Sequence, residues 1–353
     1  MINAFALSVL LAQVVLPQGS PPGNHPLDPQ TRAMVIDGIS KALIENYVSP
    51  ELGKRMASFL RTRQQKYDAA TDAIPFAEEL TSDLQEISHD KHIRVVYSAR
   101  ALPVEEGGIS SADEQRRLHT IFIKSNFSFE EAKRLPGNIG YLDLREFAPE
   151  GPSAETAAAA MNFLANTDAL IIDLRQNMGG DPAMVALLAS YFFDDAPVHL
   201  NDLHWRARDR VQQWWTQASV AGKRYGSKKR LYILTSHQTF SAAEEFAYDL
   251  QALKRAAIVG ESTGGGANPG ENRRLSQHFS MFVPMGRAVN PITRTNWENT
   301  GVKPDVAASA ETALKVAYLA ALNEVVRTAE DERLKSAILR QIEGLRKELE
   351  TTH

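Results

Sequence analysis

The first absence in this sequence is cysteine, of which the 353 residues contain none. The chain therefore forms no disulfide bond and no thiolate metal site, and a cysteine nucleophile is excluded. A complete lack of cysteine is compatible with an exported protein that avoids stray oxidation.

Strong charge and long apolar runs are also missing. The net charge of -4 at pH 7 gives no electrostatic reason to expect a nucleic acid or an anionic membrane as partner. Beyond the N-terminal segment, no apolar run resembles a transmembrane helix. Neither a G-x-G-x-x-G fingerprint nor a Walker sequence is present, which disfavours a phosphate-binding loop. The remaining composition is ordinary for a globular protein of about two domains.

The N-terminus carries an apolar run from Ala4 to Leu16, the length of a secretory h-region and too short to span a bilayer. A stretch rich in proline and glycine follows, from Pro17 to Pro26. We expect residues 1–27 to be a signal-like leader and linker, and the protein to be exported, either periplasmic or secreted. The alternative is an N-terminal segment that is docked or poorly ordered, because no Lys or Arg precedes the run.

Hydrophobic periodicity divides the rest of the chain into three parts. Residues 28–90 show helical stripes and predict an N-terminal all-helical subdomain. Residues 91–310 alternate strands and helices, which predicts an α/β core with a mixed, largely parallel sheet flanked by helices. Residues 311–353 predict C-terminal helices. Within the core we expect a surface excursion from Ala99 to Pro136 with one short strand at Thr120–Lys124.

Leu200 to Tyr225 holds three of the four tryptophans. The segment is a β-ribbon, an arm over the cleft, or a site of buried aromatic packing. The pattern alone favours the packing.

A serine marks the junction between a strand and a helix. The apolar run Leu231–Thr235 predicts a buried strand, and Phe246–Leu253 predicts a helix. Ser241 lies between them, where a hydroxyl meets the positive end of the new helix, which favours a nucleophile. The alternative is structural, because Ser241 with Glu244 is a capping box.

A second cluster of polar residues lies between a helix and an alternating strand. His89, Asp90 and His92 meet there. A histidine held at a strand and facing a cleft is a suitable general base, because imidazole titrates near neutrality. The same residues are possible metal ligands, although no other His/Asp cluster completes a site. A surface histidine pair at a helix end is the third interpretation.

Two further loops carry candidate residues. Gly179 and Gly180 follow a buried strand at the edge where active sites of parallel sheets collect. They form either an oxyanion hole from backbone N–H groups or a tight turn that needs positive φ. Glu298 stands beside Trp297 in a loop rich in Pro, Asn and Gly, and either orients a histidine or lies in a surface turn.

Five motifs in this order resemble the C-terminal processing (tail-specific) serine peptidases and the tricorn core, in particular bacterial relatives of interphotoreceptor retinoid-binding protein. The motifs are Ser88–His92, Asp173–Gly180, Thr239–Phe246, Gly260–Gly266 and Asn296–Asp305. The resemblance covers about residues 28 to 325 and implies a ClpP/crotonase-like core.

By this resemblance Ser241 is the nucleophile, His92 the base and Glu298 the tricorn-type carboxylate. The oxyanion hole would be formed by Ala242 with Gly179 or Gly180. The family members with a Ser–Lys dyad carry a lysine in the glycine-rich loop, and the loop Glu261–Ala267 has none, so a Ser–His–Glu triad is expected. The segment that in many members holds a PDZ domain is too short here for one.

The resemblance implies a serine endopeptidase that acts on unfolded or C-terminal segments of a peptide or protein, with no metal and no cofactor. The alternative is a binding protein for an apolar ligand, a retinoid or a fatty acid, on the same scaffold, since a fold does not fix a function. A metal hydrolase at His89, Asp90 and His92 is the third possibility.

Overall fold

The computed structural model describes residues 25–102 and 112–351. The predicted leader and linker, residues 1–27, therefore lie outside the described residues except for residues 25–27. The chain forms two compact units. The first contains residues 1–117, 202–212 and 266–289, and the second contains residues 118–201, 213–265 and 290–353. Segments distant in the sequence thus build the first unit together.

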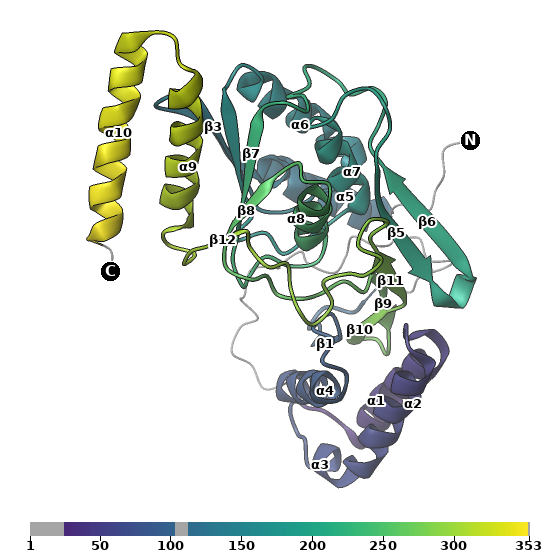
Figure 1. Ribbon diagram of the computed structural model, residues 1–353. Coiled ribbons are helices and arrows are strands. Elements are labelled where there is room, and N and C mark those ends of the chain that lie inside the picture. Colours follow the sequence, from purple (N-terminus) through teal and green to yellow (C-terminus); the bar gives the residue numbers. More distant parts are fainter. Residues whose placement is uncertain (1–24, 103–111, 352–353) are drawn as a thin grey trace. The chain divides into compact units, whose positions relative to one another are not determined.

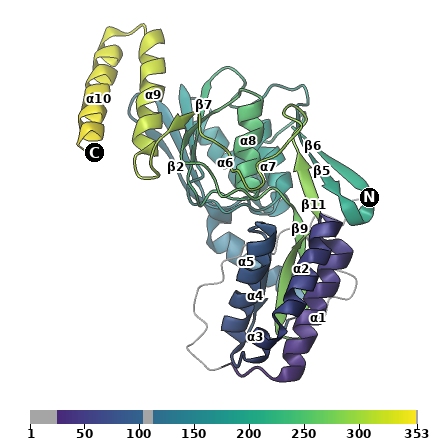
Figure 2. The same cartoon turned by 60° about the horizontal axis from the view of Figure 1, so that its bottom comes forward.

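The first unit begins with the expected helices, and α1 and α2 lie side by side (Figure 2). Their bounds are α1 Pro29–Asn46, α2 Pro50–Thr62, α3 Gln64–Asp68 and α4 Ala73–Ser88. The side chains of Asp28, Ser49 and Asp72 cap α1, α2 and α4 by accepting N–H groups of the first turn. Gly53 lets α1 and α2 approach, because a Cβ there would lie 2.4 Å from the Leu43 carbonyl oxygen.

Antiparallel strands form two further sheets. One sheet has the order β1–β10–β9, formed by β1 Arg94–Tyr97, β10 Phe279–Pro284 and β9 Gly270–Arg274. Another has the order β11–β5–β6, formed by β11 Gly286–Val289, β5 His199–Trp205 and β6 Arg210–Trp215, with the short helix η3 Arg206–Arg208 between the last two. The tryptophan-rich segment is therefore a β-ribbon. Aromatic packing explains only part of it, because Trp205 is buried while Trp215 is 43% exposed.

The second unit is organised around a sheet with the order β12–β8–β7–β4–β3–β2 (Figure 1). Its strands are β2 Phe129–Leu135, β3 Ile139–Leu144, β4 Ala169–Asp173, β7 Arg230–Thr235, β8 Ala257–Gly260 and β12 Val306–Ala307. Only the β2–β3 pair is antiparallel. The predicted α/β class with a mixed, largely parallel sheet is confirmed.

Helices cover both faces of this sheet (Figure 1). They are α6 Glu150–Leu164, α7 Pro182–Ser190, α8 Ala242–Ala252, α9 Ala313–Thr328 and α10 Glu332–Glu350. Tyr141, Ile171 and Tyr232 point to one face and pack with α9 and α10. Leu142, Ile172 and Ile233 alternate with them and are buried on the opposite face, where α6 and α8 contact the strands. None of the described helices is both long and apolar enough to cross a bilayer.

The predicted strand at Thr120–Lys124 is wrong, because these residues end helix α5, Ala112–Lys124, which is followed by the short helix η2, Asn126–Ser128. Phe122 is buried while its neighbour Ile123 is 55% exposed, and Ile121 is half-buried, as on a helix with one packed side. The short apolar run is ambiguous between the two periods. Strands β2 and β9 were not predicted, because their mostly polar sequences lack alternating apolar residues.

Candidate active site

The turn between β7 and α8 holds Ser241 in an unusual backbone conformation. Its φ is 54° and its ψ is -123°, a combination that a residue with a Cβ rarely adopts. Such strain costs on the order of 1–3 kcal/mol and is found mainly where function requires it. Ser241 is partly exposed, whereas Ala242 to Ala247 are buried. The serine therefore lies at the surface of a rigid element.

The glycine turn after β4 lies directly against this serine. A Cβ on Gly179 would be 2.8 Å from the Ser241 Cβ and 3.1 Å from the Ala242 nitrogen. Asn177 fixes the approach, since its carbonyl accepts the Phe240 N–H at 3.1 Å and its side chain donates to the Leu144 carbonyl at 3.0 Å. The structure thus brings together the predicted residues Ser241, Ala242 and Gly179.

Replacing Gly179 by alanine is expected to destabilise this turn by about 1–3 kcal/mol and to displace Ser241, because the new methyl group overlaps the serine and the φ of 118° disfavours alanine. Urea unfolding measures the loss. Gly344→Ala is the matched control: Gly344 lies inside α10, a Cβ there meets nothing within 4 Å, and stability should rise by up to about 1 kcal/mol. Equal stability of Gly179→Ala and wild type would contradict the close approach.

The two glycines do not offer the same backbone donors. The Gly179 N–H already donates to the Asn177 Oδ1 at 2.9 Å. Among the described residues, the Gly180 and Ala242 N–H groups have no hydrogen-bond acceptor. Gly180 has a φ of 134°, and a Cβ on it would lie 2.1 Å from the Phe147 carbonyl oxygen, so only glycine fits.

Glu298 belongs to the same unit as Ser241. Its loop is anchored by Trp297, which is 2% exposed and packs against Tyr248 with ring centroids 5.2 Å apart. The Asn296 side chain accepts the Glu298 N–H at 3.0 Å, and the Trp297 carbonyl accepts the Gly301 N–H at 2.9 Å. The carboxylate is thus carried by an ordered, hydrogen-bonded turn.

His92 lies in the first unit, in the short link between α4 and β1. Its side chain is buried and stacks on Phe282 with ring centroids 5.6 Å apart. The backbone N–H of His92 donates to the Asp90 Oδ1 at 3.0 Å, and the other Asp90 oxygen accepts bonds from the side chains of Tyr47 and Asn268. Asp90 therefore holds the histidine segment in place, a role that the sequence did not reveal.

The metal-site interpretation gains nothing from the geometry. His89 ends α4 in the left-handed conformation, with a φ of 57°, and is exposed, whereas Asp90 and His92 are buried. Throughout the described residues, no group of three or more His, Asp or Glu side chains is arranged to hold a metal ion.

Buried carboxyl groups lie beneath the serine turn, on the inner side of α8. Glu245 and Asp249 are 5% and 1% exposed, and Asn201 and Asn290 donate to them at 3.1 and 2.9 Å. Burial raises the pKa of Glu245 to about 7. Burial, and then the charge of Glu245, raise the pKa of Asp249 well above its ordinary value. Asp181, which caps α7, has its pKa raised to about 6, again mainly by burial.

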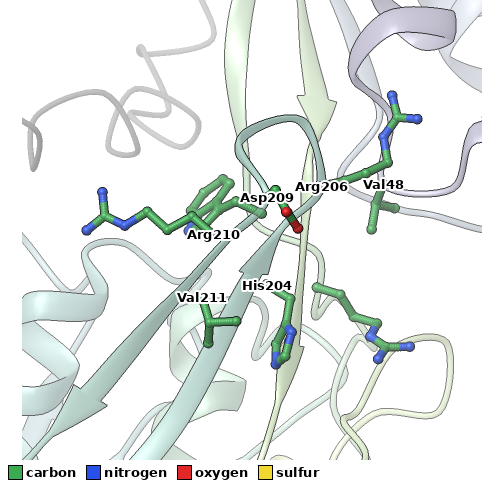
Figure 3. Close-up of a pocket in the computed structure, with 8 residues that line it drawn as sticks. Val48, His204, Arg206, Asp209, Arg210 and Val211 are labelled. Atoms are coloured by element: carbon green, nitrogen blue, oxygen red, sulfur yellow. The ribbon is translucent and has the colours of Figure 1, made fainter.

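A hollow of about 290 Å³ lies at the turn of the β5–β6 ribbon, within the first unit (Figure 3). Arg206 and Arg210 line it but point to opposite sides, so their charges do not converge (Figure 3). Arg206 also donates to the main-chain carbonyls of Ile44 and Glu45. The charged lining, which includes Arg287, does not suit an apolar ligand.

The sequence did not predict the contact between Glu244, at the serine turn, and Thr263, in the glycine-rich loop. Glu244 was expected only as a helix cap, and Thr263 was not singled out. Both side chains are buried and bonded to each other, with the Thr263 Oγ1 donating to the Glu244 Oε1 at 2.5 Å. A threonine before three glycines is the only sequence signal, and it does not indicate which carboxylate the hydroxyl meets.

Two family profiles match the chain. The profile of peptidase family S41 matches residues 138–308. The profile described as the N-terminal domain of peptidase S41 in eukaryotic interphotoreceptor retinoid-binding protein (IRBP) matches residues 30–130. The turns of Gly179, Ser241 and Glu298 fall inside the first matched range, and the His92 segment falls inside the second.

Individual proteins agree with the family match. The tail-specific protease of Haemophilus influenzae is 30% identical over 146 residues, which is 38% of this chain and 19% of that protein. The chloroplastic carboxyl-terminal-processing peptidase 2 of Arabidopsis thaliana is 29% identical over 178 residues, 48% of this chain and 33% of that protein. The chain thus spans a third or less of these relatives. In fold, a lipoprotein from Streptococcus agalactiae has a TM-score of 0.55 at 15% identity, over 86% of this chain and 100% of that one.

Proposed function

Because the chain belongs to peptidase family S41, we propose that it is a serine-type peptidase in which Ser241 is the nucleophile, His92 the general base and Glu298 the carboxylate that orients the histidine. The observation that carries the proposal is the strained Ser241 turn, pressed against Gly179 with unoccupied N–H groups beside it. A plain helix cap needs neither the strain nor these donors.

In the proposed reaction, His92 removes the hydroxyl proton as the Ser241 oxygen attacks the peptide carbonyl. The tetrahedral oxyanion accepts hydrogen bonds from the Gly180 and Ala242 N–H groups, since the Gly179 N–H is engaged by Asn177. Collapse expels the amine, which takes the proton from the histidine. Water then hydrolyses the acyl-enzyme with the same base, and the serine is regenerated.

The names of the relatives, which describe tail-specific and carboxyl-terminal processing enzymes, support a proposal for the substrate class. We propose that this chain acts on unfolded or C-terminal segments of proteins. Binding of a retinoid or fatty acid without catalysis is the alternative, and no described feature favours it over hydrolysis.

Covalent labelling by a fluorophosphonate tests the proposal. Wild-type protein should be labelled at Ser241, and Ser241→Ala should lose the label and nearly all turnover of an unfolded protein substrate. Peptide mapping of the labelled site makes the result specific. Equal labelling of both proteins, or tight binding of a fatty acid by wild type with no labelling, would overturn the proposal.

Export belongs to the proposal as well. The apolar run Ala4–Leu16 has the length and position of a secretory h-region. Fractionation of cells that express the full chain should place it outside the cytoplasm, and deletion of residues 1–27 should retain the protein in the cytoplasm.

A further inference from the structure

Glu244 is a completely buried side chain that contacts more than the serine turn. Its Oε2 accepts the Ser241 N–H at 2.9 Å, which is the reach-back bond of a capping box. Its Oε1 accepts the Thr263 hydroxyl at 2.5 Å and the Gly265 N–H at 2.6 Å, both from the glycine-rich loop. A capping box requires only the first bond, so the other two join a separate loop to the turn.

Thr263 continues the connection toward the loop of Glu298. Its hydroxyl oxygen accepts the Val302 N–H at 2.7 Å, and its N–H donates to the Val302 carbonyl at 3.3 Å. Two residues on, the Gly265 carbonyl accepts the Asn299 N–H at 2.9 Å. The residues that follow Glu298 are therefore tied to the glycine-rich loop.

Close packing makes this connection rigid. A Cβ on Gly301 would lie 2.3 Å from the Thr263 carbonyl oxygen, and the φ of Gly301 is 67°. The Gly264 N–H donates to the Thr239 carbonyl at 2.9 Å, just before the serine. The glycine-rich loop, the Ser241 turn and the Glu298 loop therefore form one hydrogen-bonded unit, with Glu244 and Thr263 at its centre.

We propose that Glu244 and Thr263 are positioning residues of the peptidase, because their hydrogen-bonded side chains fix the Ser241 turn and the Glu298 loop relative to each other. The inference rests on the proposed function, since the groups that Glu244 and Thr263 hold in place, Ser241 and Glu298, are two of the three residues assigned there. Neither side chain touches the substrate in this proposal. Both act by holding reacting groups in the geometry of attack, where a displacement of about 1 Å costs on the order of 100-fold in rate.

Thr263 offers a matched pair of substitutions. Thr263→Val keeps the shape but removes the hydroxyl, and so breaks both the bond to Glu244 and the bond from Val302. Thr263→Ser keeps the hydroxyl. We expect kcat and the fluorophosphonate labelling rate of Thr263→Val to fall about 100-fold with KM nearly unchanged, and those of Thr263→Ser to stay within about 3-fold of wild type.

Glu244→Gln provides the second variant. One carboxylate oxygen, which accepts a hydrogen bond, becomes an NH₂ group, which can only donate one. This group then faces an N–H or O–H donor, so the labelling rate should again fall about 100-fold. Glu245→Gln controls for the loss of a buried carboxyl on the same helix, because the Glu245 carboxylate accepts its hydrogen bond from Asn201 and only the Glu245 backbone N–H bonds to the serine turn, a bond that the substitution keeps. It should label at the wild-type rate.

The outcomes separate this inference from the proposed function. Failure of wild type itself to label at Ser241 refutes the peptidase assignment. Wild-type labelling together with unaltered rates in Thr263→Val and Glu244→Gln refutes the positioning role alone. Circular dichroism melting of each variant shows whether it is folded at the assay temperature, and a fall in kcat that tracks only the unfolded fraction also refutes the positioning role.

Discussion

Replacing His92 by alanine is expected to lower kcat about a million-fold, as far as removal of the serine itself, because members of a catalytic triad act as a unit. Glu298→Gln should cost less, about 10⁴-fold, since it leaves nucleophile and base in place and removes only the orienting charge. Turnover of an unfolded protein substrate measures both. The KM values should change little, because neither residue is assigned to substrate binding.

His237 is the control that makes this prediction sharp. It lies in the second unit, just before the serine turn, and its exposed ring contacts the Glu261 carboxylate at 3.0 Å. It is the histidine that sequence proximity alone would choose as the base. Activity should survive His237→Ala and vanish in His92→Ala. The opposite result would transfer the role of base to His237 and remove His92 from the site.

The buried carboxyl groups of α8 predict that the free energy of unfolding depends on pH. Burial raises the pKa of Glu245 from an ordinary 4.5 to about 7, so between these values the folded protein binds more protons than the unfolded chain. The free energy of unfolding therefore falls as pH rises through this window. The stability that proton binding to Glu245 contributes is full below pH 4.5 and is lost above pH 7. It amounts to about 3 kcal/mol.

Glu245→Gln removes this titration. Relative to wild type, the variant should gain about 2–3 kcal/mol of stability between pH 5 and pH 8, as measured by urea unfolding at both pH values. Comparison with wild type cancels the similar trends from Asp181 and Glu146, whose pKa values burial raises to about 6 and about 7. The trend from Asp249 does not cancel, because loss of the Glu245 charge also lowers the pKa of Asp249, and this change adds to the gain of the variant. Glu155→Gln, at an exposed position of α6, should show no such gain. A parallel pH response of wild type and Glu245→Gln would contradict the prediction.

Much of the second unit could be predicted from the sequence because its strands are nearly continuous apolar runs. Ala169–Asp173 and Leu231–Thr235 are buried on both faces, as parallel central strands are. The serine and glycine turns follow such strands directly, so their meeting at one edge of the sheet was foreseeable. The edge strand β2 was missed for the opposite reason, because most of its side chains are exposed and carry no pattern.

The finer features of the site could not be predicted because they depend on contacts between distant segments. That Asn177 occupies the Gly179 N–H, and leaves the Gly180 N–H for an oxyanion, follows from a side-chain rotamer and not from composition. The capping box correctly linked Glu244 to Ser241, but the second oxygen of Glu244 meets a loop that local pattern does not connect to it. Asp90 likewise shows its role only through Tyr47 and Asn268.

The pairing of β1 with β10 has a consequence for the order in which the protein is made. Arg94–Tyr97 pairs with Phe279–Phe282, so the first strand of the chain leaves the ribosome long before its partner exists. The N-terminal helices can form meanwhile, yet the β1–β10–β9 sheet stays incomplete until synthesis passes Pro284. Contacts of such high sequence separation slow folding and prolong the exposure of an unpaired strand edge. A nascent chain stalled before β9 should therefore be digested by proteases in its N-terminal part, and the release of the full chain should protect it.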